Sequence, residues 1–210
     1  PGVTDQKILY QGAEAKIIKS TYLGYDAVIK KRVQKRYRIK EIDQVLIQSR
    51  TKQEAKVISL SRSHGVSVPI IYDVDLTNGS ITFEYVKGKR IKDIFDSIPS
   101  LQRKKLCYQI GSQIGLLHNA EIIHGDLTTS NMILSDNKVY FIDFGLSEIT
   151  TEIEKRGVDL HLLMEALEST HSSHANFFSY VLNAYAETYT ENPELVKEKI
   201  DDIVKRGRYR

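Results

Sequence analysis

Short β-rich runs dominate the first hundred residues of the chain, whereas apolar residues at helical spacing dominate the remainder. In the first part, β-branched and aromatic runs stand on either side of Gly24 and of Thr77-Asn78-Gly79, where the chain can turn sharply. A longer stretch with a helical pattern lies between them. We therefore predict two hairpins and one helix. The hairpin strands are 16–23 with 25–30 and 70–75 with 80–86, and the helix is 37–63.

Helical periodicity is clearest in the second part of the chain. One apolar stripe recurs at Leu106, Ile110, Ile114 and Leu117. It predicts a central helix that starts shortly after Pro99, with Ser100 as its N-cap. Similar spacing indicates three further helices. Their apolar residues are Leu160, Leu163, Met164 and Leu167, then Phe178, Val181, Leu182 and Tyr185, and finally Leu195, Val196, Ile200 and Ile203.

This change of pattern predicts an α+β fold with two lobes in one domain. A chain of 210 residues suits such a domain and is long enough to bury a sizeable core. We expect a small β-rich N-terminal lobe, residues 1–86, and a helical C-terminal lobe with a basic tail, residues 87–210. Lys87-Gly88-Lys89 would connect the two lobes.

Composition and charge are those of an ordinary globular protein. Hydrophobic residues make up 41% and charged residues 27%, and the net charge of +3 is too small to indicate nucleic-acid binding by itself. The single cysteine, Cys107, excludes an internal disulfide and a cysteine-based zinc cluster, and it fits a reducing compartment. No apolar run approaches the length of a membrane span, and residues 1–11 lack the apolar core of a secretory signal. We expect a cytoplasmic protein.

The strongest chemical signal is His124-Gly125-Asp126-Leu127-Thr128-Thr129-Ser130-Asn131, followed by Asp143-Phe144-Gly145. Phosphoryl transfer needs a carboxylate near the nucleophile and oxygen ligands for magnesium, because it is catalysed mainly by placement and charge neutralisation. Asp126 is the candidate catalytic carboxylate. Asn131 and Asp143 are the candidate metal ligands.

A predicted hairpin joins these two motifs. Its strands are the apolar runs 132–134 and 139–142, with Asp136-Asn137 between them. In the protein-kinase superfamily, the catalytic aspartate likewise lies five residues before the metal-binding asparagine, and a DFG aspartate follows. The chain resembles that superfamily in both motifs, their order and their separation. The resemblance implies a bilobal protein-kinase-like fold with ATP and Mg²⁺ as cofactors.

Ala27-Val28-Ile29-Lys30 resembles the kinase strand whose lysine contacts phosphate, so Lys30 is the candidate catalytic and ATP-binding lysine. Lys31 and Arg32 compete for this role, and a solvated basic strand end is the alternative. Glu54 is the candidate helical partner of the lysine. Glu41 is a competitor, since an exposed helix commonly carries glutamate.

Further ATP contacts follow from the same resemblance. Gln11-Gly12-Ala13-Glu14-Ala15 stands where kinases have a glycine-rich loop, and although Gly12 is its one glycine, backbone NH groups can still cap phosphates. Phe83-Glu84-Tyr85-Val86 resembles the inter-lobe hinge, where Glu84 and Val86 would bind adenine through backbone groups. A half-buried edge strand is the alternative. The expected apolar contacts are Val28, Ile133 and Ile142.

Several departures separate the chain from ordinary protein kinases. Gly125 and Thr128 stand where those kinases have arginine and lysine. Only residues 146–158 separate the DFG segment from Asp159, and no Ala-Pro-Glu element appears. We therefore expect the peptide-binding platform to be missing and an activation loop to lack its usual cationic partner for phosphate.

Across nearly its whole length, the chain resembles the small Rio-like atypical kinase and ATPase subunit of the KEOPS complex. The resemblance rests on Gln-Gly-Ala-Glu-Ala, Ala-Val-Ile-Lys-Lys-Arg, the segment 37–51, His-Gly-Asp-Leu-Thr-Thr-Ser-Asn and the terminal Arg-Gly-Arg-Tyr-Arg. It implies ATP hydrolysis, Ser/Thr autophosphorylation and a supporting role in threonylcarbamoyladenosine modification of tRNA. It also implies contacts with other KEOPS subunits, above all the carbamoyl-transferring one, to which some archaeal members are fused.

Three other functions stay open from the sequence. A small-molecule phosphotransferase also carries His-Gly-Asp followed by Asn, but usually has a larger helical insertion than 210 residues accommodate. A stand-alone Ser/Thr protein kinase would need the missing peptide platform. A nucleotide-gated scaffold without turnover is disfavoured by the retention of Lys30, Asp126, Asn131 and Asp143.

The remaining histidines and basic residues have structural as well as functional interpretations. His124 is expected to brace the catalytic loop rather than bind a metal, and His171 and His174 lack a third ligand. The segment 30–40, with seven basic residues in eleven, would touch tRNA or an acidic partner, or be a solvated helix face. The terminal arginines are expected to contact a partner. They are Arg206, Arg208 and Arg210.

Overall fold

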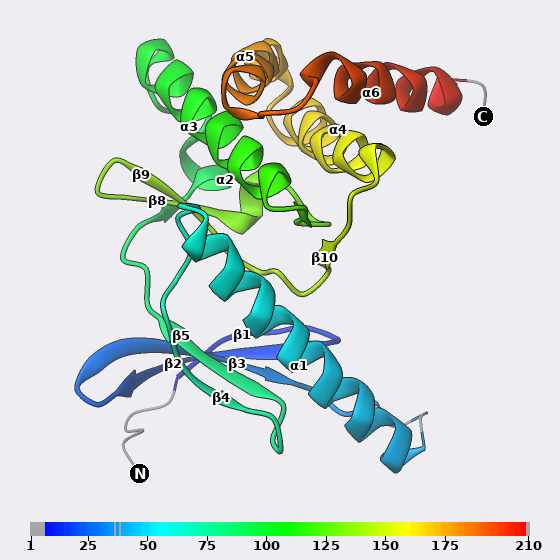
Figure 1. The fold of residues 1–210 in the computed structure, drawn as a ribbon. Coiled ribbons are helices and arrows are strands. Elements are labelled where there is room, and N and C mark those ends of the chain that lie inside the picture. Colours follow the sequence, from blue (N-terminus) through cyan, green and yellow to red (C-terminus); the bar gives the residue numbers. More distant parts are fainter. Residues whose placement is uncertain (1–6, 36, 38, 209–210) are drawn as a thin grey trace. The chain divides into compact units, whose positions relative to one another are not determined.

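The computed structural model describes residues 7–35, 37 and 39–208, and these residues form two compact units. The first unit is drawn from Pro1–Ser59 and Pro69–Val86, and the second from Leu60–Val68 and Lys87–Arg210 (Figure 1). The first contains an antiparallel sheet and most of one long helix. The second is mainly helical, so the predicted α+β class is confirmed.

The sheet of the first unit has the strand order β1-β2-β3-β5-β4, and every neighbouring pair is antiparallel. Both predicted hairpins are present. Leu23 and Gly24 both have positive φ, +49° and +87°, so Leu23 belongs to a tight turn rather than to the preceding strand. The strands are β1 (Lys7–Gln11), β2 (Ala15–Tyr22), β3 (Tyr25–Arg32), β4 (Ile71–Asp75) and β5 (Ser80–Glu84).

Helix α1 (Lys40–Ser63) confirms the helix predicted between the hairpins, although it begins three residues later than expected. It reaches the β4–β5 turn through Ile47, which is 7% exposed. Gly79 in that turn has φ +61°, and a Cβ there would lie 2.1 Å from Cγ2 of Ile47. The turn therefore requires glycine both for its backbone conformation and for its contact with α1.

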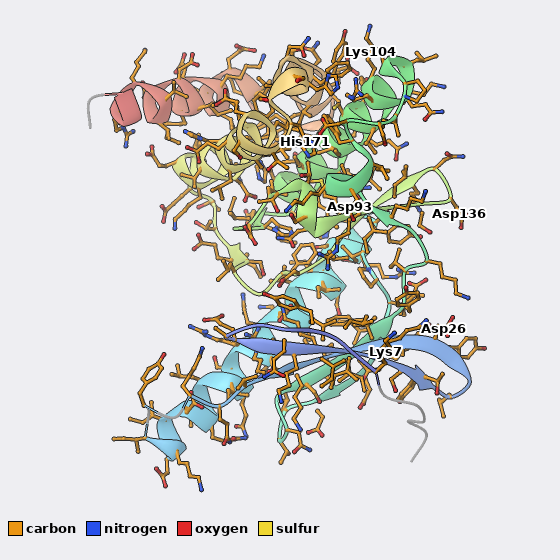
Figure 2. All side chains as sticks on the ribbon, turned by 180° about the vertical axis from the view of Figure 1, so that it is seen from behind. Lys7, Asp26, Asp93, Lys104, Asp136 and His171 are labelled. Carbon is orange, nitrogen blue, oxygen red and sulfur yellow. The ribbon has the colours of Figure 1, made fainter. Side chains whose placement is uncertain are left out.

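The second unit contains two small antiparallel sheets. The larger has the order β6-β8-β9, and its β8–β9 pair is the hairpin predicted between the two catalytic motifs. Asp136 and Asn137 have φ +47° and +60° and form its turn, with Asp136 at the tip (Figure 2). The other sheet pairs β7 with β10. The strands are β6 (Lys89–Arg90), β7 (Ile122–Ile123), β8 (Met132–Ser135), β9 (Lys138–Phe141) and β10 (Glu148–Ile149).

Five α-helices and two short 3-10 helices complete the described part of the second unit, besides the last residues of α1. Helix α3 packs against α5, and α4 packs against α6 (Figure 1). The helices are α2 (Ile91–Ile94), α3 (Ser100–Asn119), α4 (Ile153–Thr170), α5 (Phe178–Thr188), α6 (Pro193–Arg208), η1 (Thr129–Asn131) and η2 (Ser172–Phe177). None of the helices within the described ranges is both long and apolar enough to cross a membrane.

Helix α3 forms the centre of this unit, as its apolar stripe predicts. The four stripe residues are at most 3% exposed, and Cys107 beside them is fully buried. The predicted N-cap is wrong by one position, because Pro99 occupies the cap and Ser100 is the first helical residue, without a side-chain capping bond. Near the C-terminus, α6 continues through Arg208, so much of the predicted basic tail is helical.

Replacing Gly111 by alanine should destabilise the fold. A Cβ at this position of α3 would lie 2.1 Å from the Val181 carbonyl oxygen and 3.0 Å from Cβ of Ala184, so the α3–α5 contact would have to open. We expect the free energy of unfolding to fall by about 2–3 kcal/mol, measured by urea denaturation.

Gly207→Ala is the matched control, because no atom of the described residues, its own turn of α6 aside, lies within 4 Å of its Cβ position. There the gain in helix propensity, at most about 1 kcal/mol, should leave stability unchanged or slightly higher. Equal effects of the two substitutions would show that close packing does not account for Gly111.

Candidate active site

The backbone of the candidate catalytic loop, residues 124–131, is anchored by a buried carboxylate. Asp159, on α4 and fully buried, accepts hydrogen bonds from the amides of His124 and Gly125 at 2.8 and 2.9 Å. His118 Nε2, from α3, lies 3.3 Å from the same carboxylate. A charged group without solvent requires such donors, so the loop that begins the His-Gly-Asp motif is fixed to α4.

His124 braces the loop against the strand that leads to the second motif. Its Nδ1 accepts from the Asp126 amide at 3.3 Å, and its Nε2 lies 3.1 Å from the Ile142 carbonyl oxygen. Its ring packs on Phe144, with 4.6 Å between ring centroids. Burial lowers the pKa of His124, which favours the neutral ring that this pairing needs. The predicted structural role of His124 is confirmed.

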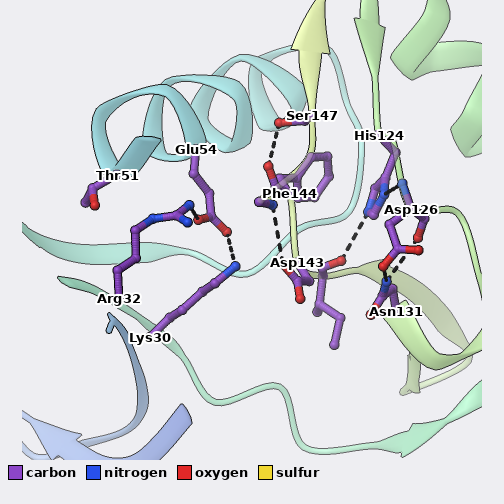
Figure 3. Close-up of polar contacts among 12 residues, drawn as sticks. Lys30, Arg32, Thr51, Glu54, His124, Asp126, Asn131, Asp143, Phe144 and Ser147 are labelled. Carbon is purple, nitrogen blue, oxygen red and sulfur yellow. Dashed lines mark hydrogen bonds and ion pairs between the residues drawn. The ribbon is translucent and has the colours of Figure 1, made fainter. Parts of the chain in front are cut away.

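Asp126 and Asn131 are bonded directly to one another. The amide nitrogen of Asn131 donates to the Asp126 carboxylate at 2.7 Å and to its backbone carbonyl at 3.0 Å. The Ile142 amide donates to the Asn131 carbonyl at 2.9 Å, which ties the loop to the residue before Asp143. Figure 3 shows these side chains on neighbouring segments of the second unit. The two motifs are thus brought together, as the hairpin predicts.

The Asp143-Phe144-Gly145 segment forms a sharp turn with one strained residue. Asp143 is exposed and has φ +63°, a conformation that is uncommon for a residue other than glycine. Its carboxylate accepts from the Gly145 amide at 3.3 Å, and Ser147 Oγ donates to the Phe144 carbonyl at 2.6 Å. Phe144 is 1% exposed. The buried phenylalanine therefore fixes the turn that presents the exposed aspartate.

Glycine is required at position 125 because the segment after the Asp143 turn passes close to its backbone. Gly125 has φ +81°, and a Cβ there would lie 2.3 Å from the Leu146 carbonyl oxygen. Pairing of Ile123 with Glu148, between β7 and β10, continues the contact. No side chain fits at Gly125, which gives a physical reason for the absence of the arginine that ordinary kinases carry there.

In the first unit, two cations share one buried carboxylate. Lys30 Nζ lies 2.7 Å from Glu54 Oε1, and Arg32 Nη2 lies 2.6 Å from Glu54 Oε2 (Figure 3). Glu54 is 2% exposed, Lys30 9% and Arg32 8%. Lys30 and Arg32 point to the same face of β3 because strand side chains alternate, whereas Lys31 is exposed. The geometry pairs Lys30 with Glu54 as expected, excludes Lys31 from this cluster and adds Arg32 to it.

Other predicted ATP-binding residues of the first unit lie on the strands of the same sheet or shortly after a strand. Gly12 is in the β1–β2 turn, where its amide donates to the Ala15 carbonyl at 3.0 Å. Val28 is half-buried on β3, two residues before Lys30. Glu84 ends β5, and its carboxylate accepts from the Ile70 amide at 3.1 Å. Val86, 9% exposed, is the last residue of this unit.

Two predicted apolar contacts belong to the second unit. Ile133 is half-buried on β8, opposite Tyr140, and Ile142 is half-buried directly before Asp143. Ile133 is two residues after Asn131, and the Ile142 amide donates to the Asn131 carbonyl, so both lie next to Asn131. They form an apolar surface beside the two motifs.

Sequence reasoning assigned no role to Asp159 or His118. A signal for Asp159 exists, because it is an acid directly before Leu160 in an apolar helical stripe, and a buried acid needs a partner. His118 also falls on the buried face of α3, where burial lowers its pKa. Neither signal names the partner, since 35 residues of chain separate Asp159 from His124.

The oxygen donors present are of the kind that Mg²⁺ takes. Among residues 7–35, 37 and 39–208, no group of three or more histidine, cysteine, aspartate or glutamate side chains could hold a metal by itself. Mg²⁺ in nucleotide sites commonly uses one or two protein oxygens together with phosphate oxygens and water. One exposed carboxylate, Asp143, and the amide oxygen of Asn131 fit that requirement. A metal site at His171 and His174 does not fit, because both ring nitrogens of His171 are bound to other side chains.

The RIO domain family matches residues 7–158. The chain is 47% identical to the KEOPS complex subunit Bud32 of Pyrococcus abyssi, over 97% of this chain and 96% of that protein. It is also 36% identical to the EKC/KEOPS complex subunit bud32 of Dictyostelium discoideum, over 96% of this chain and 82% of that protein.

A second group of relatives is longer. The chain is 45% identical to the probable bifunctional tRNA threonylcarbamoyladenosine biosynthesis protein of Methanobrevibacter smithii, over 96% of this chain but 36% of that protein. It thus spans about a third of the length of the bifunctional relatives. From the extent of these matches and the catalytic motifs, the chain belongs to the RIO domain family, with its protein-kinase-like fold, and within it to the Bud32 family of KEOPS subunits.

Proposed function

We propose that this chain binds ATP with Mg²⁺, hydrolyses it, autophosphorylates on Ser or Thr, and thereby supports threonylcarbamoyladenosine modification of tRNA within a KEOPS complex. The single observation that carries the enzymatic part is the direct bond between Asp126 and Asn131, in a loop tied to Ile142 directly before Asp143. A catalytic carboxylate and two magnesium-binding oxygens are the parts that phosphoryl transfer requires of a protein.

In the second unit, Asp126 is the residue that accepts a proton from the attacking water or hydroxyl. The Asn131 amide nitrogen orients its carboxylate, and Asp159 holds the backbone on which both stand. The remaining amide oxygen of Asn131 and the carboxylate of Asp143 would hold Mg²⁺. When bound, the ion neutralises charge on the phosphate oxygens.

In the first unit, Lys30 is the cation for the phosphates of ATP. Glu54 keeps its ammonium group in place, and Arg32 balances the carboxylate from the other side. The backbone around Gly12 would cap phosphate oxygens, and the backbone of Glu84 and Val86 would bind adenine. Val28, Ile133 and Ile142 would supply apolar contacts.

The KEOPS part of the proposal comes from the relatives. Proteins named as Bud32 subunits and as bifunctional threonylcarbamoyladenosine proteins match this chain along nearly its whole length. The proposed partners are the other KEOPS subunits, in the cytoplasm. Within the segment 30–40, Lys30 and Arg32 are buried against Glu54, so the proposed contacts to tRNA or partner are its other basic residues and those of the C-terminus. Arg36, Arg38 and Arg210 lie outside the described residues, and Arg208 is described only in its backbone.

The first experiment distinguishes an active ATPase from a nucleotide-gated scaffold without turnover. Purified chain should release phosphate from ATP in a magnesium-dependent manner, and more so with the carbamoyl-transferring partner and tRNA. Asp126→Ala should lower turnover at least ~100-fold, because it removes the proton acceptor while leaving nucleotide binding intact. Asp143→Ala should also remove magnesium-dependent nucleotide binding, measured by calorimetry. Tight ATP binding with no release by the unaltered chain would favour the scaffold.

Lys30→Met and Arg32→Met should separate catalysis from stability. Each variant leaves Glu54 with one cation, so each should fold, at a cost of about 1–3 kcal/mol for a weakened buried pair. Lys30→Met should lose phosphate release, whereas Arg32→Met should retain part of it. Lys31→Met is the matched control on the exposed face of β3 and should resemble the unaltered chain in thermal melting and turnover. Equal turnover of Lys30→Met and Lys31→Met would contradict the assignment of Lys30.

Deleting Arg206 to Arg210 should disturb the response to a partner more than the fold. Arg206 makes an exposed ion pair with Glu154 at 3.1 Å, and such surface pairs contribute up to about 1 kcal/mol. We expect little change in the melting temperature and a loss of partner-stimulated phosphate release. Stimulation that equals that of the full chain would refute a role of these residues in partner contact.

A further inference from the structure

His171 lies against the catalytic loop, far from it in sequence. It is the C-cap of α4, where its amide donates to the Leu167 carbonyl at 2.9 Å. Its side chain is buried, 1% exposed, among the helices of the second unit (Figure 2). The ring packs against Phe95, just after α2, with 4.8 Å between ring centroids. A buried histidine with no part in metal binding must have other partners for its two nitrogens.

Both ring nitrogens of His171 are bound to side chains from other segments. Nδ1 lies 2.9 Å from Asp96 Oδ2, and Nε2 lies 3.0 Å from Thr129 Oγ1. A carboxylate only accepts hydrogen bonds, so Nδ1 carries the proton. In the neutral ring, Nε2 then accepts the hydroxyl proton of Thr129. The carboxylate, the ring and the hydroxyl form one chain of hydrogen bonds with a single consistent direction.

Thr129 is the point where this chain of bonds meets the catalytic loop. It opens the 3-10 helix η1 between Asp126 and Asn131 and is 2% exposed. The helix has only three residues, and the Asn131 amide donates to the Thr128 carbonyl at 3.0 Å. So short a 3-10 helix has little stability of its own. Its position therefore depends on side-chain contacts, and the Thr129 hydroxyl makes one that is shielded from water.

We propose that His171 is a positioning residue for phosphoryl transfer, with Asp96 fixing its ring and its Nε2 holding Thr129 so that Asp126 and Asn131 keep their mutual geometry. Asp159 anchors the start of the loop, and His171 anchors the part that leads into Asn131. The expected effect on turnover rests on the proposed function. The expected effect on the order of the loop rests on the hydrogen bonds alone.

Thr129→Val and Thr129→Ser test the proposal in the full chain. Valine keeps the volume but removes the hydroxyl, and leaves Nε2 of His171 without its partner. Serine keeps the hydroxyl and loses a methyl group. We expect Thr129→Val to lower kcat for magnesium-dependent ATP hydrolysis roughly tenfold with little change in KM, and Thr129→Ser to restore most of it. A residue that only fills space would give the opposite order, because valine packs better than serine.

Hydrogen exchange supplies a readout that needs no activity. Amides of residues 124–132 should exchange faster in Thr129→Val than in Thr129→Ser, with exchange in the first unit unchanged. Thr188→Val is the matched control, because its hydroxyl bonds within its own helix, to Ala184, and it should affect neither readout. If the unaltered chain shows no hydrolysis but the exchange difference appears, the proposed function fails and the positioning role stands.

A double-mutant cycle with His171→Ala completes the test. If the two residues act through one bond, the double variant should be no slower than the slower single variant. Independent, multiplicative losses of kcat would overturn the proposal. So would equal loop exchange in the valine and serine variants, whatever the activity of the unaltered chain.

Discussion

The geometry of the catalytic loop depends on one fully buried negative charge. Asp159 has no solvent to stabilise its carboxylate, so its position is set by the donors that surround it: two loop amides and the His118 ring. An uncompensated charge there would lower the free energy of unfolding by several kcal/mol, and this penalty holds the loop, α3 and α4 together. Asp126 is thereby held on a backbone that cannot shift independently of the helical core.

The first unit also holds a buried carboxylate, and here two positively charged side chains stabilise it. Glu54 is buried with two cations, Lys30 and Arg32, on the same face of β3. A carboxylate with two partners stays neutralised when one of them engages a phosphate. Here Arg32 would keep α1 attached to the sheet.

Backbone contacts hold the segment after Asp143 against the catalytic loop. Gly125 lets the Leu146 carbonyl approach the catalytic loop, and pairing of β7 with β10 continues that contact. The segment after Asp143 is held by these contacts and by Phe144 in the core, and Gly125 offers no side chain for a phosphate group to bind. This arrangement fits the expectation that an activation loop would lack its usual cationic partner for phosphate.

The sequence by itself determined the three hairpins and the five long helices, though not the short elements β1, β6, β7, β10 and α2. It also determined the order of the two catalytic motifs and the family resemblance, because periodicity, turn residues and motif spacing are local properties of the chain. It also paired Lys30 with Glu54. Only the tertiary structure decided that Arg32 joins them, that Asp159 carries the loop and that His171 meets Thr129. Those partners are separated by tens of residues, and a hydrogen bond between buried groups leaves no periodic trace in the sequence. Folding selects them because a buried polar group without a partner is costly.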